Sequence, residues 1–257
     1  MRPFVSKATG VQMAKAAVLI GLGKSIAELK AEGYLPSNMD GASLPEETAI
    51  AVKAAVLPFA RFRTPEGVVV DSLLSPEMRS TGEVMGLDKH YDTAFAKAQA
   101  GAGSPLPTSG KVFISVANHD KRNVIIYAKM LESLGFEIVS TGGTAEILRR
   151  NGLNSVLVAS KFAEANGDHS IVDMVRNGDI DLILNTPAGG AARSDGYEIR
   201  AAAVSVGCPV MTTISEFAAA VQAINALREH SWDIMSLQEH GVQLAAAVDA
   251  RSEGGEA

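Results

Sequence analysis

The second half of the chain alternates short apolar segments with amphipathic helical patterns, and this alternation constrains the fold more than any other feature. The segments of strand length are residues 111–117, 136–140, 155–159, 181–185 and 208–212. Helical patterns begin near Asp120, Thr144, His169, Ser194 and Ser215. This order predicts an α/β fold in which helices cover both faces of a Rossmann-like parallel sheet, with right-handed crossovers. A last edge strand is predicted over residues 233–237.

The first 100 residues lack this alternation. Residues 9–12 and 25–28 have the spacing of capping boxes and predict a helical hairpin or a kinked helix. Residues 48–59 are interpreted as a strand near a sheet edge because of Pro58, and residues 60–87 as irregular. Asp88 is predicted to cap a further helix. This part of the chain is therefore expected to be mostly helical.

Four regions follow from these patterns. A linker is predicted where glycine, serine and proline are mixed, and a disordered tail where the sequence becomes polar. The expected boundaries are 1–100 for the first unit, 101–110 for the linker, 111–240 for the sheet unit and 241–257 for the tail. The chain opens directly into a helix with no strand before it, so we expect a piece of a larger protein.

Composition limits the function. The 257 residues are 47% hydrophobic with a net charge of −6, which is typical of a globular protein and argues against binding nucleic acid through overall charge. No apolar run approaches the roughly 20 residues that span a bilayer, and Lys7 and Lys15 interrupt any signal-peptide core. We expect a cytoplasmic protein with no membrane contact. Cys208 is the one cysteine, which excludes a CxxC metal site.

A Thr-Gly-Gly-Thr turn, residues 141–144, joins a predicted strand to a predicted helix. Two glycines leave the backbone N–H groups uncovered, and the start of the helix attracts anions through its dipole. Alone, such a turn is usually only a connection. However, polar residues also follow the other predicted strands, and in an open parallel sheet ligands bind at the carboxyl ends of strands.

These polar residues form the candidate site for a phosphorylated small molecule. They are Lys121, Thr141, Gly142, Gly143, Thr144, Lys161, Asn185 and Thr186, with Thr212 and Thr213 after the last strand. Each has a plainer interpretation, since a lysine is often solvated and a threonine often caps a helix. Their convergence on one edge favours the pocket.

The sequence evidence for a catalytic residue is weaker than the evidence for a phosphate-binding site. Asp168 and His169 lie where a helix should begin, Asp173 falls within that helix, and Asp195 starts the next one. No Ser/His/Asp order, metal-ligand spacing or Walker-type loop occurs. The sequence therefore favours binding over catalysis, with no catalytic residue and no metal site.

Several strings resemble a known family. Residues 111–240 resemble the methylglyoxal-synthase-like (MGS-like) domain, and residues 4–100 resemble the end of the second ATP-grasp synthetase unit in the large subunit of carbamoyl-phosphate synthases. The first half carries PFVSKATG at residues 3–10, VLPF at 56–59 and PEMRSTGEVMG at 76–86. Together the two parts cover nearly the whole chain.

The resemblance implies a regulatory portion of a glutamine-hydrolysing ligase. The family makes carbamoyl phosphate for pyrimidine and arginine biosynthesis from bicarbonate, glutamine-derived ammonia and ATP. It uses Mg²⁺ or Mn²⁺ with K⁺, and its large subunit works with a glutamine amidotransferase small subunit. The ATP-grasp residues of the family lie upstream of Phe4, so this chain is expected to hold no cofactor and to be inactive alone. Its last domain is expected to bind the effectors UMP or IMP, and ornithine at its border.

The family's nucleotide site corresponds to Lys121, Thr141, Thr144, Lys161 and Asn185, and its ornithine site to Leu57, Asp195 and Thr212. Pro187 stands in place of a nucleotide-binding threonine, Ala54 in place of a glutamate that holds the ornithine amine, and Val210 in place of an aromatic residue. The alternative function is a phosphate lyase of the methylglyoxal synthase type, which needs an aspartate that residues 141–144 do not supply. A third possibility is that residues 1–100 act mainly as an association surface.

Overall fold

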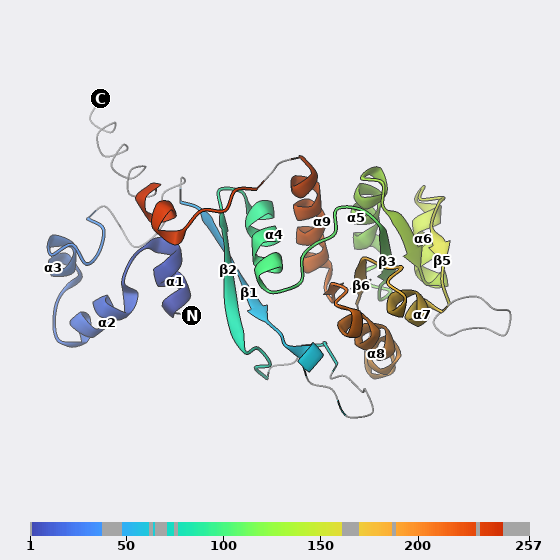
Figure 1. Ribbon diagram of the computed structural model, residues 1–257, viewed down its shortest axis with the longest axis horizontal. Coiled ribbons are helices and arrows are strands. Elements are labelled where there is room, and N and C mark those ends of the chain that lie inside the picture. Colours follow the sequence, from blue (N-terminus) through green and yellow to red (C-terminus); the bar gives the residue numbers. More distant parts are fainter. Residues whose placement is uncertain are drawn as a thin grey trace.

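The computed structural model describes residues 2–37, 48–61, 64, 71–74, 77–160, 170–186, 189–229 and 232–243, with the backbone alone for residues 2, 60 and 189–195. Within these ranges the molecule is elongated. The parallel sheet lies at one end, three short helices lie at the other, and a two-stranded ribbon lies between them (Figure 1). None of the helices in these ranges has the length and apolar character that a bilayer crossing requires.

The five predicted parallel strands are confirmed. They are β3 (Lys111–Ser115), β4 (Glu137–Ser140), β5 (Leu157–Val158), β6 (Leu182–Asn185) and β7 (Val210–Met211). All are parallel, in the order β5-β4-β3-β6-β7. The chain thus runs outward from β3 to β5 and returns to the other side of β3. The order reverses between β3 and β6, and in such sheets a crevice lies outside the carboxyl ends at that point.

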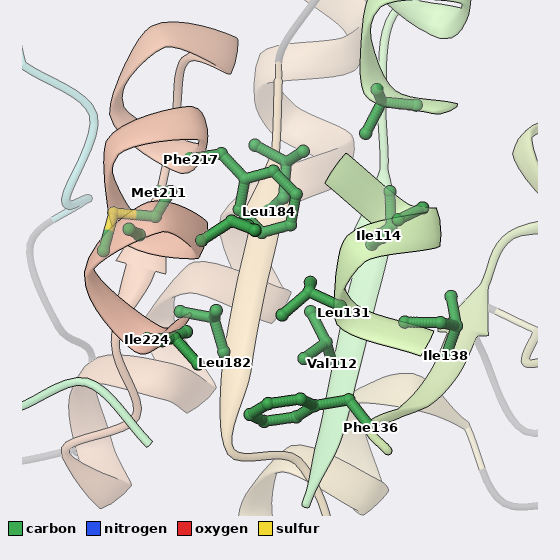
Figure 2. Packing of buried hydrophobic residues seen from close by; sticks show 14 of the residues in the cluster. Val112, Ile114, Leu131, Phe136, Ile138, Leu182, Leu184, Met211, Phe217 and Ile224 are labelled. Carbon is green, nitrogen blue, oxygen red and sulfur yellow. The ribbon is translucent and has the colours of Figure 1, made fainter. Parts of the chain in front are cut away.

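Two hydrophobic layers sandwich the sheet, because successive side chains of a strand point to opposite faces. Val112 and Ile114 face a cluster shared with α5 (Lys121–Ser133), α6 (Gly142–Arg150) and α9 (Ile214–Glu229). Figure 2 shows this cluster, in which Leu131, Phe217 and Ile224 pack over the strands. Phe113 faces the other layer, with α7 (Ile171–Arg176) and α8 (Gly189–Val206).

The strand predicted over residues 233–237 is wrong. Residues 232–236 have no regular structure and residues 237–243 are helical. Ser236 starts this helix, because its Oγ accepts the N–H of Glu239 (3.2 Å) while Glu239 Oε2 accepts the N–H of Ser236 (2.7 Å). Of the tail predicted over 241–257, residues 244–257 lie outside the described ranges.

The first part of the chain is less helical than predicted. Besides α1 (Arg2–Thr9), α2 (Met13–Gly21) and α3 (Ile26–Ala31), it holds an antiparallel ribbon of β1 (Ile50–Val56) and β2 (Gly82–Asp88). The strand expected within residues 48–59 is confirmed as β1, whereas β2 lies in the segment expected to be irregular. A 3-10 turn, η1 (Phe59–Arg61), follows β1.

Of the three predicted helix caps, one forms as expected and two differ from the prediction. Ser25 and Glu28 form the expected capping box. Thr9 instead ends α1, with its hydroxyl donating to Val5 O (2.8 Å), and α2 begins only at Met13. Asp88 lies just outside the next helix: its Oδ1 accepts the N–H of His90, the residue before α4 (Tyr91–Gly101).

Helix α4 joins the ribbon to the sheet unit. It packs against β1 and β2 on one side and against α9 on the other (Figure 1). Phe95 of α4 and Leu106 of the predicted linker are buried in the same cluster as Val112 of β3. The boundary at 101–110 stays a prediction, and one continuous core crosses it.

Candidate functional site

The carboxyl ends of three neighbouring strands bring several of the predicted residues together. In the register of the sheet, Ile114 of β3 lies beside Ser140 of β4, and Ser115 lies beside Asn185 of β6. Thr141 and Thr186 are the next residues along, so they flank the end of β3 from opposite sides. This edge coincides with the reversal of strand order.

The Thr-Gly-Gly-Thr turn forms the first turn of α6. Thr141 is the N-cap in extended conformation (φ −72°, ψ 152°), and its carbonyl accepts the N–H groups of Thr144 (3.0 Å) and Ala145 (2.8 Å). Among the described residues, no acceptor bonds the N–H groups of Gly142 and Gly143. Both glycines are exposed, and a Cβ at Gly142 would meet open space. The turn therefore presents free donors, as the sequence predicts.

Lys121 reaches this turn from the neighbouring helix. It is the first residue of α5, and its Nζ lies 3.3 Å from the position that a Cβ on Gly143 would take. A cationic amine thus stands beside the positive end of a helix dipole with uncovered N–H groups. Such an arrangement attracts an anion from two sides.

The hydroxyl groups of the edge are not equivalent. Thr144 is buried, and its Oγ1 accepts the N–H of Val116 (3.4 Å); Thr186 is also buried, and its Oγ1 accepts the N–H of Ala117 (2.9 Å). These two hydroxyls hold the segment that follows β3. Thr141 is less buried and pairs with Ser115, with 3.3 Å between Oγ1 and Oγ. Thr141 and Ser115 are thus more accessible than the buried Thr144 and Thr186.

Asn185 is buried at the end of β6, and its partner is a residue that the sequence did not point to. Arg200 Nη1 donates to Asn185 Oδ1 (2.9 Å), while Nε and Nη2 donate to the two carboxylate oxygens of Asp71 (2.7 Å each). Burial opposes ionisation of Asp71, but hydrogen bonds from Arg200 and from the N–H of Leu73 hold its pKa below its ordinary value.

The sequence did not identify three residues of this edge, and the reason differs for each: Ser115, Arg200 and Asp71. Ser115 is polar and ends an apolar strand, so the rule that found Asn185 could have found it. Arg200 lies in an amphipathic helix, where an arginine is usually solvated. Asp71 lies in a segment expected to be irregular, and no sequence signal pairs it with a residue 129 positions away.

Some predicted residues stay untested. Lys161, Asp168, His169 and Pro187 lie outside the described residues, and only the backbone of Asp195 is described. Their predicted roles stay predictions.

Asp173 is described, and it belongs to a helix cap. Ser170 Oγ accepts the N–H of Asp173 (3.2 Å) and donates to its carboxylate (2.6 Å) at the start of α7. Asp173 is partly buried and therefore has a structural role at this helix start.

The predicted ornithine residues lie on separate elements. Leu57 follows β1 in the ribbon, and Thr212 follows β7 at the edge of the sheet. The N–H of Thr212 donates to Glu216 Oε2 (3.3 Å) in the first turn of α9. Burial raises the pKa of Glu216, and the bond from Thr212 offsets part of that rise.

Two other sequence inferences concern cysteine and metals. Burial raises the pKa of Cys208 to about 12, and its Sγ lies 3.4 Å from Ile180 O, so the thiol is packed and protonated. In the described ranges, no group of three or more His, Cys, Asp or Glu residues is arranged to hold a metal ion.

The sequence of this chain is similar to those of known proteins. Residues 123–212 match the family described as the MGS-like domain. The carbamoyl phosphate synthase large chain of Kocuria rhizophila is 69% identical over 240 residues, which are 93% of this chain and 22% of that protein. The chain carries an MGS-like domain and is homologous to part of the carbamoyl phosphate synthase large chain. The family resemblance of the sequence motifs is thereby confirmed.

Other relatives extend this match. The carbamoyl phosphate synthase large chain of Paenarthrobacter aurescens is 62% identical over 251 residues (96% of this chain, 23% of that protein). That of Streptomyces griseus is 54% identical over 249 residues. The chain thus spans about a fifth of the length of these relatives. The MGS-like match covers all of α6, β6 and β7, and it begins after β3 and Lys121.

Proposed function

We propose that this chain is a regulatory portion of a carbamoyl phosphate synthase large chain, and that the edge around β3 binds the phosphate of a nucleotide monophosphate such as UMP or IMP. The observation that carries the proposal is the amine of Lys121 beside Gly143 at the start of α6. The ligand class comes from the family resemblance, and the chemistry of the edge is compatible with it.

The phosphate would lie between the amine of Lys121 and the free N–H groups of Gly142 and Gly143. A phosphate monoester carries close to two negative charges and three acceptor oxygens at neutral pH. A single amine and two backbone donors supply charge and hydrogen bonds of the matching kind. Thr141 is then the hydroxyl best placed for a further acceptor of the ligand. Lys161 would add a second cation.

The activity of the whole synthase belongs to the same proposal. It comprises the ligase reaction with ATP, Mg²⁺ or Mn²⁺ and K⁺, the glutamine amidotransferase partner, and the link to pyrimidine and arginine biosynthesis. This chain alone is expected to make no carbamoyl phosphate. Effector control requires that the ligand bind two arrangements of the adjoining synthetase unit unequally.

Calorimetric titration with UMP, IMP and inorganic phosphate tests the binding step. Lys121→Ala should weaken UMP binding by the ~1.5–3 kcal/mol of a charged hydrogen bond, which is roughly tenfold or more. Lys129→Ala is the matched control, because Lys129 is an exposed residue two turns further along α5. Equal affinity in the wild type and Lys121→Ala would reject the role of Lys121.

Ornithine is the second proposed effector, at a site formed by Leu57, Asp195 and Thr212. Ala54 and Val210 lack the carboxylate and the aromatic ring that the resemblance implies. A thermal-shift comparison of ornithine with UMP tests this step, because a ligand that binds the folded form raises the melting temperature. An unchanged melting temperature at saturating ornithine would remove ornithine from the proposal.

A phosphate lyase is the competing function, and the MGS-like match is the observation that favours it. That chemistry needs a carboxylate beside the phosphate turn. In the described part of the chain, Lys121 and the hydroxyl of Ser115 contact the turn, and the carboxylate of Asp71 is bonded to Arg200. Incubation with dihydroxyacetone phosphate and an assay for methylglyoxal decide between the two functions.

A further inference from the structure

Arg200 joins the candidate edge to a segment outside the parallel sheet. Its side chain is fully buried in α8, with 0% exposure. One edge of the guanidinium, formed by Nε and Nη2, donates to both carboxylate oxygens of Asp71, which lies in the connection between β1 and β2. The remaining nitrogen bonds Asn185 Oδ1 at the end of β6. Arg200 thus fixes the position of one predicted effector-binding residue.

The chemistry of the guanidinium determines the orientation of the Asn185 amide. A guanidinium has only donors, so the amide group must turn its oxygen toward Arg200. The NH₂ group is then the free end of the side chain, and it bonds no acceptor among the described residues. The oxygen of Asn185 is thus engaged by Arg200, whereas its N–H donors are left for a ligand.

Gly196 shows how closely these groups are packed. It lies one helical turn before Arg200, and a Cβ there would come 2.3 Å from Arg200 Nη1 and 2.5 Å from Asn185 Oδ1. Glycine inside a helix is less favourable than alanine. Its absence of a side chain leaves room for the Arg200–Asn185 contact, which holds the amide in a single orientation.

Asp71 neutralises the charge of Arg200. A bidentate arginine–carboxylate pair is geometrically specific, and here its net charge is zero. Among the described residues, attraction of an anion to the edge therefore comes from Lys121 and the start of α6, while Arg200 acts through Asn185.

On the basis of the proposed function, we infer that Arg200 is a positioning residue that makes Asn185 a donor-only specificity group, so that the ligand must place an acceptor oxygen there. Phosphate oxygens and the carbonyl oxygens of a nucleobase satisfy this requirement, whereas a ligand amine at that position does not. Because Asp71 holds the same guanidinium, the β1–β2 connection and the effector edge share one hydrogen-bond network.

Two substitutions separate orientation from folding. Asn185→Asp keeps an oxygen for Arg200 but replaces the two donors by a second acceptor, and it should weaken UMP binding by at least about tenfold. Arg200→Lys keeps the charge but not the planar fork, so it should weaken UMP binding in the wild type. In an Asn185→Ala background, where no amide remains to be oriented, Arg200→Lys should have no further effect on affinity.

The side-chain amide of Asn185 provides a direct readout. Its two ¹⁵N-correlated proton signals should shift on addition of UMP to the wild type, and in Arg200→Lys this shift should be reduced together with affinity. Urea unfolding of each variant checks that the chain is folded. If Arg200→Lys does not fold, Asn185→Asp carries the test by itself.

The outcomes are distinguishable. A wild-type chain that binds no nucleotide monophosphate rejects the proposed function and this inference together. A wild-type chain that binds UMP, with unchanged affinity in a folded Asn185→Asp or Arg200→Lys chain, overturns the inference and leaves the proposed function standing. Tighter binding by Asn185→Asp would also overturn it, because the ligand would then need a donor.

Discussion

The amine of Lys121 lies against Gly143, where a methyl group would come within 3.3 Å of Nζ. The two residues begin neighbouring helices, α5 and α6, and meet because β3 and β4 are adjacent parallel strands that end at the same edge. The missing side chain at Gly143 lets the amine approach the first turn of α6. The proposed anion site therefore depends on a glycine at position 143.

Gly143→Ala should separate affinity from stability. The added methyl displaces the amine of Lys121 and should lower UMP affinity by about 1 kcal/mol, roughly fivefold. Alanine in a helix should leave the free energy of unfolding unchanged or raise it by up to ~1 kcal/mol. Calorimetry and urea unfolding measure the two effects. In a Lys121→Ala background, a further loss of affinity would show that the methyl acts other than through the amine.

The ribbon and α4 meet at Gly86, where substitution should be costly. A Cβ there would lie 1.9 Å from Ala94 O and 2.6 Å from Ala98 N, both of them backbone atoms of α4. Gly86→Ala should destabilise the chain by about 1–3 kcal/mol or more, since the backbone must shift. Gly82→Ala on the same strand is the control, because its Cβ would only touch Val56 at 3.9 Å. Similar unfolding midpoints for both variants would contradict this packing.

Strand β2 was not predicted from the sequence, whereas the five strands of the parallel sheet were. The reason is that different interactions stabilise them. Each strand of the parallel sheet is a short apolar run, because helices cover both of its faces. Strand β2 carries Gly82, Glu83 and Gly86, and only its packing against β1 and α4 makes it a strand. A glycine needed for close approach to a helix resembles a turn residue in the sequence. Local signals therefore could not find β2.

The candidate site was likewise predictable only where its residues lie close to their strands in the sequence. Lys121 and the Thr-Gly-Gly-Thr turn are near neighbours of their strands, so the rule about carboxyl ends brought them together. The contact of Arg200 with Asp71 joins residues 129 positions apart, and no periodicity encodes it. The direction of the Asn185 amide follows from that contact. Tertiary packing, rather than local pattern, thus sets the hydrogen-bonding character of the edge.

Glu216 should make stability depend on pH. Burial raises its folded-state pKa above the ordinary 4.5, so the folded chain retains a proton that the unfolded chain releases. Stability from this group is complete below the unfolded pKa and is lost as the pH rises through the folded pKa. Glu216→Gln should therefore reduce that loss and raise the free energy of unfolding near neutral pH. Urea unfolding at about pH 5 and about pH 8 measures the difference; an equal pH dependence in both chains would contradict it.

Thr186 should matter for the fold of the edge. Its buried Oγ1 accepts the N–H of Ala117 at 2.9 Å, and valine would leave this N–H unpaired. Thr186→Val should lower the free energy of unfolding by about 1–3 kcal/mol. Ser133→Ala, which removes an exposed hydroxyl bonded to Met130 O, should change it far less. Equal effects of the two substitutions would remove the structural role of Thr186.

The most direct test of the phosphate site is a titration of the ¹⁵N-labelled chain with UMP, followed through its backbone amide signals. Binding at the proposed edge predicts the largest shifts at Gly142 and Gly143, with smaller ones at Lys121 and Thr144, and little change in the β1–β2 ribbon away from Asp71. Shifts that centre on α1–α3, or no shifts at saturating UMP, would contradict a nucleotide site at the end of β3.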